Sequence, residues 1–488
     1  MKLSKRFISS ALLAAIIGLL AACGNEINST RVGNEVTTSD NLPESVTAKA
    51  EEAEIPEDKY EGYEFRMLGK ETPEASSVNE LFAESETGDT LNDAIYQRNR
   101  MVEERFDIKM KLITSESRIS DMNNAVLAGD DAYDIVLDTS VNIAPAISNR
   151  YVHSINDLQY IDIDKSWWNT ALINDSAING NPYFLMGDIS YSWRDATWVL
   201  CFNKRLYSEY GLEEPYKMVR EGRWTIDVLE EHCRDITKDL NGDSKLDKDD
   251  QWGMLSSKTA GLGLVTSTGI ASVSKAKDGS LEYSLDSERN IDVLGRIRKL
   301  MTNNDIQLRA EDLTGSSNIW TDIINIFRNG RALYRVSIML DVIGLRDMND
   351  DFGILPLPKY DESQEQYYTT YQGWQGGALV VPVTITDTAR TSAIIEYMAS
   401  VSKDTITNAY YNVNLQGKVA RDDDSAEMLD IIFNSMTTDI GLAFWRGTIE
   451  NTLKTIINSD SDVAVSTLAS AKDSIVTELE KFETEAKG

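Results

Sequence analysis

The chain has 488 residues and carries 79 acidic against 48 basic side chains, a formal net charge of −31. This charge argues against nucleic acid as a partner, because phosphate binding relies on clustered Lys and Arg. The length exceeds what one hydrophobic core supports, so we expect two or more lobes. Only two histidines occur, which excludes a His-rich zinc site.

The first 23 residues have the layout of an export signal. Three basic residues precede an apolar run from Ile8 to Leu20, which is too short for a stable membrane anchor. Ala21, Ala22 and Cys23 close the segment in a pattern that resembles a bacterial lipobox, where the cysteine is lipidated. We therefore predict a signal peptide at residues 1–23, a lipid on Cys23 and a location at the extracellular face of the cell membrane. The alternative is an ordinary signal peptide in which Cys23 is incidental.

Residues 24–57 contain almost no aromatic and few large aliphatic side chains. Such a segment buries too little apolar surface to offset the entropy of ordering the chain. We expect it to be a disordered tether between the lipid and the folded body.

Strand and helix patterns then alternate, which predicts an α/β fold with a mostly parallel sheet. Strand patterns occupy residues 63–68, 108–112 and 133–138, and helical spacing occupies residues 91–106 and 125–128. The run at 133–138 is nearly all apolar, as expected of a strand covered on both faces. Open α/β sheets bind ligands at the carboxyl ends of their strands, which makes Asp138, Thr139 and Ser140 candidate ligand-binding residues.

The middle of the chain is rich in helices before strand patterns return. Helices are predicted at residues 225–238, 287–303 and 319–329, and strands at 332–339, 352–357 and 378–383. Helices dominate from residue 388 onward, and the last one carries Leu468, Ile475, Leu479 and Phe482 on one face.

Cys201 and Cys233 are the remaining cysteines. An exported protein could join them in a disulfide, which the sequence alone does not establish. Cys233 falls on an apolar helical stripe, which favours a buried free thiol.

Residues 239–250 resemble a calcium-binding loop of the EF-hand or dockerin type. Oxygen-bearing side chains stand at loop positions one, three, five, nine and twelve, and a backbone carbonyl is available at position seven. The predicted ligands are Asp239, Asn241, Asp243, Lys245, Asp247 and Asp250. Ser244 replaces the usual glycine and Asp250 the usual glutamate, which weakens the match. We expect a structural calcium ion; the alternative is an acidic, solvated turn.

Several tryptophans stand beside glycine or polar residues instead of within apolar stripes. Sugar rings stack their C–H faces on indole, while their hydroxyls pair with Asp, Asn, Arg or Gln. The candidate ligand-binding residues are Tyr191, Trp193, Arg194, Asp195, Trp374 and Gln375. The alternative for each is an ordinary core aromatic or its neighbour.

Catalysis is weakly supported. No acidic residue stands in an apolar context that would raise its pKa as a general acid requires, and the motifs of serine hydrolases, zinc proteases and phosphate loops are absent from the sequence. An extracellular glycan-degrading enzyme remains the alternative from another class, since the 79 acidic residues are enough to supply a carboxylate pair.

Segments over residues 60–485 resemble the family 1 extracellular solute-binding proteins of ABC transporters, which include maltose- and oligosaccharide-binding proteins. The matching segments are residues 201–206 with 210–212, 222–225, 327–332 and 351–358. The resemblance implies two α/β lobes joined by a hinge, with residues 58–190 and 335–383 in lobe 1 and residues 191–334 and 384–488 in lobe 2. It places three crossings between lobes near residues 188–200, 332–340 and 381–384.

The resemblance also implies a function without chemistry on the ligand. The family's late cleft tryptophan matches Trp445, which we expect to project into open space and to stack on the ligand. The implied protein binds a carbohydrate, expected to be an oligosaccharide, and delivers it to permease subunits. The same scaffold binding a peptide or another polar solute is the third possibility.

Overall fold

The computed structural model describes residues 51–70, 79–411 and 422–487. The predicted signal peptide, Cys23 and the predicted tether as far as residue 50 lie outside these residues. Residues 51–57, however, are ordered against the body. Lys165 forms an ion pair with Glu54 at 3.4 Å, and Arg105 donates to the Pro56 carbonyl at 2.6 Å. The tether prediction is therefore wrong for residues 51–57, where contacts distant in sequence fix a polar segment.

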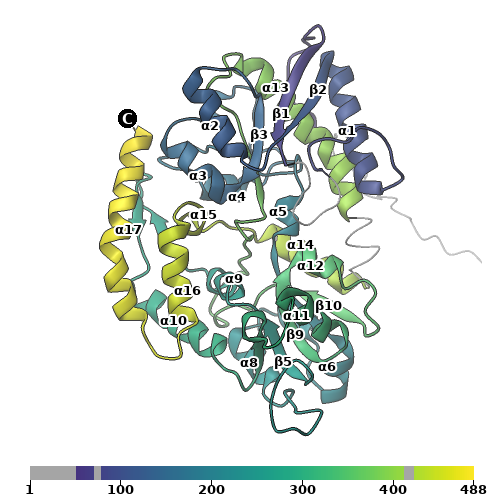
Figure 1. Ribbon diagram of the computed structural model, residues 1–488, viewed down its shortest axis with the longest axis vertical. Helices are drawn as coiled ribbons and strands as arrows, with labels where there is room; N and C mark the ends of the chain where they lie inside the picture. Colours follow the sequence, from purple (N-terminus) through teal and green to yellow (C-terminus); the bar gives the residue numbers. More distant parts are fainter. Residues whose placement is uncertain (1–50, 71–78, 412–421, 488) are drawn as a thin grey trace, which may run out of the picture. The chain divides into compact units, whose positions relative to one another are not determined.

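The first sheet has the strand order β11-β3-β1-β2. Its strands are β1 (Tyr63–Gly69), β2 (Ile108–Thr114), β3 (Ile135–Thr139) and β11 (Gly377–Val380). β1 pairs in parallel with β2 and β3, and β11 runs antiparallel to β3. Alternate β1 residues face opposite cores, since Met67 packs with α1 and α13 while Leu68 packs with α2 and α3. Figure 1 shows these helix pairs on opposite sides of the sheet.

The helices of this lobe are α1 (Thr90–Phe106), α2 (Arg118–Ala128), α3 (Ser140–Ser148), α4 (Thr170–Asp175) and α13 (Thr388–Ser402), with short helical turns at Ile155–Asp157 and Lys403–Thr407. Local signals set their ends. The Asp89 carboxylate caps α1 by accepting from the amides of Leu91 and Asn92. Gly129 ends α2 with a φ of 70°, a left-handed conformation that favours glycine.

The second sheet has the order β10-β4-β9-β5-β8. Its strands are β4 (Trp198–Asn203), β5 (Trp252–Ser256), β8 (Gln307–Arg309), β9 (Ala332–Ile338) and β10 (Phe352–Leu355). β5 is parallel to β8 and β9, whereas β4 is antiparallel to β9 and β10. A two-stranded sheet of β6 (Val273–Lys275) and β7 (Leu281–Tyr283) lies in the same half of the chain.

The remaining helices are α5 (Ser192–Asp195), α6 (Lys204–Tyr210), α7 (Pro215–Arg220), α8 (Ile226–Cys233), α9 (Ala260–Ser267), α10 (Glu288–Met301), α11 (Ile319–Arg328), α12 (Met339–Ile343), α14 (Asp423–Asn434), α15 (Ile440–Phe444), α16 (Asn451–Ile457) and α17 (Ala464–Lys487), with helical turns at Ala310–Asp312 and Arg446–Glu450. The predicted apolar stripe of the last helix is confirmed, because all four of its residues are buried. Cys201 and Cys233 are free and buried, as favoured from the sequence.

Two of the predicted lobe boundaries are wrong. The boundary at residue 335 cuts β9, a continuous strand of the second sheet, and β10 also belongs to that sheet. Residues 335–355 therefore lie in lobe 2, because β9 pairs with β4 and β5 over its whole length. The boundary at residue 384 fails because α13 packs against α1 in lobe 1.

The chain crosses between the lobes at places that differ partly from the prediction. The first crossing, predicted at residues 188–200, is confirmed, since Leu185 pairs with β11 and Trp198 begins β4. The second lies between β10 and β11, where Gln372 N donates to Ala196 O at 2.8 Å and Trp198 N to Thr370 O at 3.0 Å. These two segments run side by side. The third is not at 381–384, because α13 still packs against α1 in lobe 1, whereas α14 packs against β10 in lobe 2.

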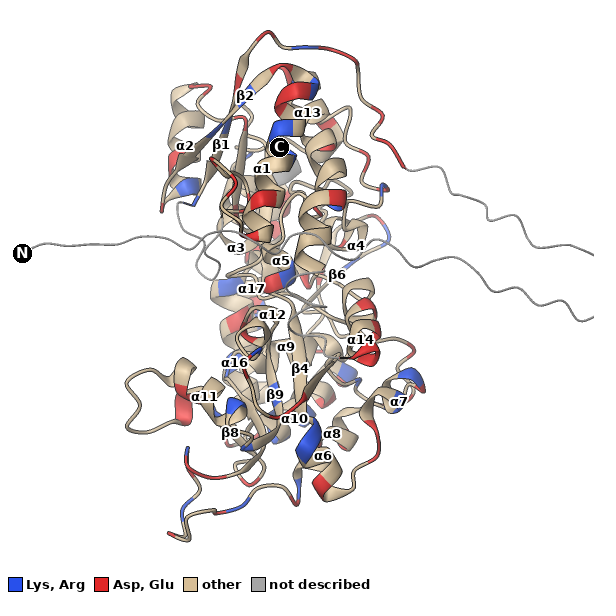
Figure 2. Cartoon of the chain, turned by 90° about the vertical axis from the view of Figure 1, so that its right-hand side faces the viewer, with Lys and Arg blue, Asp and Glu red and all other residues tan. Residues whose placement is uncertain are grey.

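None of the helices in the described ranges combines the length and apolar character needed to cross a membrane. In the same ranges, Lys and Arg are scattered among Asp and Glu instead of forming one band (Figure 2).

Candidate functional site: the cleft between the sheets

Both sheets turn the carboxyl ends of parallel strands toward one cleft. In the first sheet, Lys70 follows β1 and Asp138 and Thr139 end β3. In the second sheet, Ser256 ends β5 and Ile338 ends β9. The carboxyl ends of parallel strands meet at one edge, which is where open α/β sheets bind ligands. Asp138 and Thr139 therefore line the cleft at this edge, and their contact with a ligand stays a prediction.

The cleft has three connected parts, which share lining residues. The first-sheet pocket, which includes Asp138, encloses about 1200 Å³. The junction pocket, which includes Tyr371, encloses about 520 Å³. The second-sheet pocket, which includes Arg335, encloses about 970 Å³. Trp374 lines the first two, and Trp198 lines the last two. These volumes include space open to solvent, and together they exceed what one small solute fills.

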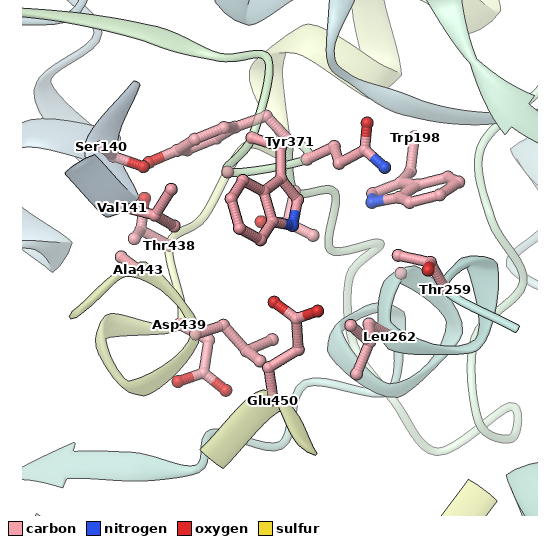
Figure 3. A pocket seen from close by; sticks show the side chains of 16 residues that line it. Ser140, Val141, Trp198, Thr259, Leu262, Tyr371, Thr438, Asp439, Ala443 and Glu450 are labelled. Atoms are coloured by element: carbon pink, nitrogen blue, oxygen red, sulfur yellow. The ribbon is translucent and has the colours of Figure 1, made fainter. Parts of the chain in front are cut away.

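Three hydroxyl groups converge beside the junction pocket, where they have no hydrogen-bond partner apart from one another. Ser140, Tyr371 and Thr438 are all buried, and none of their oxygens makes a hydrogen bond of good geometry within the described chain. Burial raises the pKa of the Tyr371 phenol, and the nearby Ser140 and Thr438 hydroxyls partly offset this. Figure 3 shows Tyr371 reaching Ser140. Buried polar groups are ordinarily paired, so three hydroxyls that have no other partner retain hydrogen-bonding capacity for a ligand.

Tryptophan and carboxylate side chains complete the junction pocket. A Cβ atom at Gly263 would lie 2.9 Å from Cγ of Trp198, so glycine lets α9 approach the indole closely. Glu450 is buried, accepts from Nε of Arg446 at 3.0 Å and directs its carboxylate into the pocket (Figure 3). The Arg446 guanidinium lies over the Trp374 ring, so the Arg446–Glu450 ion pair contacts a tryptophan that lines the cleft.

The cations of the cleft are neutralised by acids of the cleft. Arg118 pairs with Asp138 at 2.7 Å, Arg335 pairs with Asp341 at 2.7 Å, and Lys70 pairs with Glu116 at 3.6 Å. These are all the Lys and Arg among the described residues that line the three pockets. An anionic ligand would therefore compete with carboxylates already in place. The lining favours a neutral, polar ligand.

Burial raises the pKa of two carboxyl groups to about 7, contrary to the expectation that no acid has such an environment. Asp195 lies in the first-sheet pocket and accepts from the Tyr410 hydroxyl at 2.7 Å. Glu396 accepts from the indole nitrogens of Trp167 and Trp168 at 3.1 and 2.9 Å, outside the cleft. The sequence missed both because the apolar neighbours come from distant segments.

Six of the nine predicted ligand residues line the cleft: Asp138, Thr139, Tyr191, Asp195, Trp374 and Gln375. Trp193 and Arg194 do not line it. Trp193 is buried and donates to the Gly187 carbonyl at 3.0 Å, while Arg194 pairs with Asp188 at 2.6 Å. They point inward because α5 is a single turn, which sends successive side chains in different directions.

Trp445 has a different environment from the one expected. It is 7% exposed and packs edge-on against Phe482, with ring centroids 5.0 Å apart. It lines a side cavity with Val141 and Glu478, next to the junction pocket but not part of it. The expectation that its ring projects into open space is wrong, because α17 covers it; its contact with a ligand stays a prediction.

The sequence analysis missed Arg118, Arg335, Tyr371, Thr438 and Glu450 as lining residues. One signal was available for Tyr371, which stands in an aromatic and glycine-rich stretch at residues 367–377. A Cβ at Gly376 would lie 2.3 Å from the Tyr371 ring, so these glycines allow the tight turn that presents Trp374. The two arginines and Thr438 carry no local signal.

In the predicted calcium loop, residues 239–250, one backbone feature agrees with EF-hand loops. Ser244, at the position where glycine is usual, has a φ of 65°. The Asp239 carboxylate accepts from the amides of Gly242 and Ser244, and Asp250 accepts from those of Leu240 and Asp247. The donor set consists of oxygens, which suits calcium. No group of three or more His, Cys, Asp or Glu side chains among the described residues is arranged to hold a metal ion.

Comparisons with protein-family models and with curated proteins give no match. Solved structures match most of the chain. An ABC substrate-binding protein from Listeria monocytogenes in complex with cycloalternan is 14% identical, with a TM-score of 0.53 over 86% of this chain and 99% of that one. A cyclo/maltodextrin-binding protein complexed with maltotetraose is 12% identical, with a TM-score of 0.55 over 88% and 98%.

A third structure binds a ligand that is not a sugar. UgpB from Mycobacterium tuberculosis, in complex with glycerophosphocholine, is 17% identical, with a TM-score of 0.55 over 86% of this chain and 99% of that one. At these identities the likeness concerns the fold. The predicted two-lobed fold, and the resemblance to the family 1 solute-binding proteins at the level of fold, are confirmed.

Proposed function

We propose that the chain is an extracellular solute-binding protein of an ABC importer, and that it binds a carbohydrate in the cleft and delivers it to permease subunits. The observation that carries the ligand class is the cluster of three hydroxyls, on Ser140, Tyr371 and Thr438, beside tryptophans. Sugar hydroxyls both donate and accept, so they can pair with such groups, and sugar C–H faces stack on indole. The paired cations support a neutral ligand.

Binding would work by closure of the lobes. A ligand in the junction pocket touches Ser140 of the first lobe and Leu262 of the second. A ligand that contacts both lobes stabilises the closed arrangement over the open one. The side-by-side segments at residues 196–198 and 370–372 are the expected hinge, because they join the sheets with a few hydrogen bonds.

The test is a thermal-shift screen of the chain against a glycan panel, with Tyr371→Phe as the matched variant. A sugar that binds the folded state raises the melting temperature by mass action. Tyr371→Phe should weaken binding about tenfold yet change the stability of the empty protein little, because the Tyr371 hydroxyl has no hydrogen-bond partner apart from the neighbouring Ser140 and Thr438 hydroxyls.

Two outcomes would contradict the proposal. If the panel causes no shift while anionic or cationic solutes do, the ligand class is wrong. If the bound sugar is recovered as shorter products, the chain is a glycan-degrading enzyme, with Asp195 as the first acid to examine because its pKa of about 7 suits a general acid.

The lipid anchor remains part of the proposal. It rests on the basic start, the apolar run and Cys23 in the sequence. A lipid on this residue would hold the chain at the extracellular face of the membrane, near its permease. Labelling of cells with a tagged fatty acid tests it, and an unlabelled chain would contradict it.

We also propose that residues 239–250 close around a structural calcium ion, which would draw together side chains that are not so arranged in the described structure; the ligands would be Asp239, Asn241, Asp243, Asp247, Asp250 and the Lys245 carbonyl. EGTA should lower the melting temperature without abolishing sugar binding, because none of these residues lines the cleft pockets. Asp239→Ala should reproduce the decrease. The Trp252 indole donates to the Asp247 carbonyl at 2.8 Å. The fluorescence of Trp252 should therefore change as calcium is added. If added calcium does not change the melting temperature, the loop is a solvated acidic turn without a bound ion.

A further inference from the structure

The second-sheet pocket contains a tryptophan whose position the packing of the lobe does not explain. Trp320 lies in the first turn of α11 and is 53% exposed, whereas Trp374 is half-buried and the other seven tryptophans are buried. It continues the apolar stripe of Ile323 and Phe327 by one turn, but it projects past the core to the pocket. A large exposed indole at the rim of a cleft is typical of a binding surface.

A buried cation with an unused donor lines the same pocket. Arg335 on β9 is 4% exposed, and its Nη2 donates to Asp341 at 2.7 Å. The Ser337 hydroxyl donates to the same carboxylate oxygen at 2.6 Å, so Asp341 is fixed from two sides. Nη1 of Arg335 is buried and has no hydrogen-bond partner in the described chain. The ion pair therefore holds the guanidinium with one donor free for a ligand in the second-sheet pocket.

An acceptor stands in the same pocket from a different segment. Oε1 of Gln375, on the second crossing between the lobes, is also buried without a partner in the described ranges. A ligand hydroxyl can accept from Arg335 and donate to Gln375, whereas a carboxylate can only accept. The Asp341 charge compensates that of Arg335, so an uncharged hydroxyl fits better than an anion.

We propose that the second-sheet pocket is a separate subsite for an outer unit of an oligosaccharide, with Trp320 as its stacking platform and Arg335 as its hydrogen-bond donor. This rests on the proposed function. Trp198 and Thr259 line both this pocket and the junction pocket, so a unit held here can be covalently joined to one held there. A monosaccharide occupies one pocket only. Trp320 is then a specificity-determining residue that favours longer ligands.

The experiment compares affinity with ligand length. Calorimetry would use 1→4-linked glucose, xylose and mannose ladders of one to six units, with the wild-type chain, Trp320→Ala, Trp320→Phe and the control Leu127→Ala. Leu127 is exposed on α2 and lines none of the cleft pockets. Trp320→Ala should weaken the longer ligands about tenfold and leave the monosaccharide unchanged. Trp320→Phe should lie between, and Leu127→Ala should match the wild type.

Acrylamide quenching gives a second readout on the wild-type chain itself. Trp320 is the most exposed tryptophan, so it dominates the quenchable fluorescence. Long ligands should protect it and the monosaccharide should not. Unchanged affinities in Trp320→Ala, or an equal loss at every length, would overturn the subsite while leaving the proposed function standing. Failure of the wild-type chain to bind any ladder would count against the proposed function, and the subsite would fall with it.

Discussion

Replacing Trp374 with alanine should weaken carbohydrate binding about thirtyfold or more, corresponding to about 2 kcal/mol. Trp374 lines both the first-sheet and the junction pockets, and one face of its ring is held by Arg446. A sugar stacked on the ring would lose that contact in both pockets. The melting temperature of the empty protein should change little, because Trp374 stands on a turn and is only half-buried.

Trp445→Ala is the matched control, since it removes the same side chain from a packed environment. It should lower the free energy of unfolding by about 3 kcal/mol, as large-to-small changes in cores do, because Trp445 packs against Phe482. Calorimetry and denaturant titration on both variants separate the two effects. If Trp445→Ala folds normally and loses the ligand while Trp374→Ala binds normally, then Trp445 is the residue that contacts the ligand and Trp374 is not.

Replacing Arg98 with alanine should destabilise the chain by about 3 to 5 kcal/mol, as loss of a large buried side chain with several charge-assisted hydrogen bonds does. Arg98 is fully buried on α1. Its guanidinium donates to the carbonyls of Glu80 at 3.1 Å, Leu81 at 2.9 Å and Ile189 at 3.4 Å. Alanine would leave these carbonyls without that donor and would open a cavity. The midpoint of urea denaturation measures the effect.

Arg100→Ala provides the control on the same helix. Arg100 is exposed and pairs only with Glu103, at 2.7 Å, among the contacts described for it. Exposed pairs of this kind contribute at most about 1 kcal/mol. Arg98 also fixes the Glu80–Leu81 backbone, which lines the first-sheet pocket, so the folded fraction of Arg98→Met should bind sugar more weakly. Equal denaturation midpoints for Arg98→Ala and Arg100→Ala would contradict a stabilising role for the buried hydrogen bonds of Arg98.

The sequence by itself determined where the strongly periodic helices and strands of this protein lie. Alternation at residues 63–68, helical spacing at 91–106 and the apolar run at 133–138 correspond to β1, α1 and β3 within two residues at each end. Each of these patterns depends on neighbours within one or two turns, so it survives in the sequence alone. The same holds for the position of Asp138 and Thr139 at the cleft, because they follow the apolar run and so stand at the carboxyl end of a parallel strand.

Only the tertiary structure decided which distant segments meet. The sheet that β9 and α13 join, the ordering of residues 51–57 and the covering of Trp445 by α17 depend on partners far away in the chain. The same is true of the pKa of Asp195, which rises because distant segments of the chain bury the carboxyl group, although the hydrogen bond from Tyr410 lowers it. Periodicity specifies which face of an element is apolar, but not which element covers it. For this reason the sequence predicted a cleft, and the structure supplied its cations, its cluster of hydroxyls and Trp320.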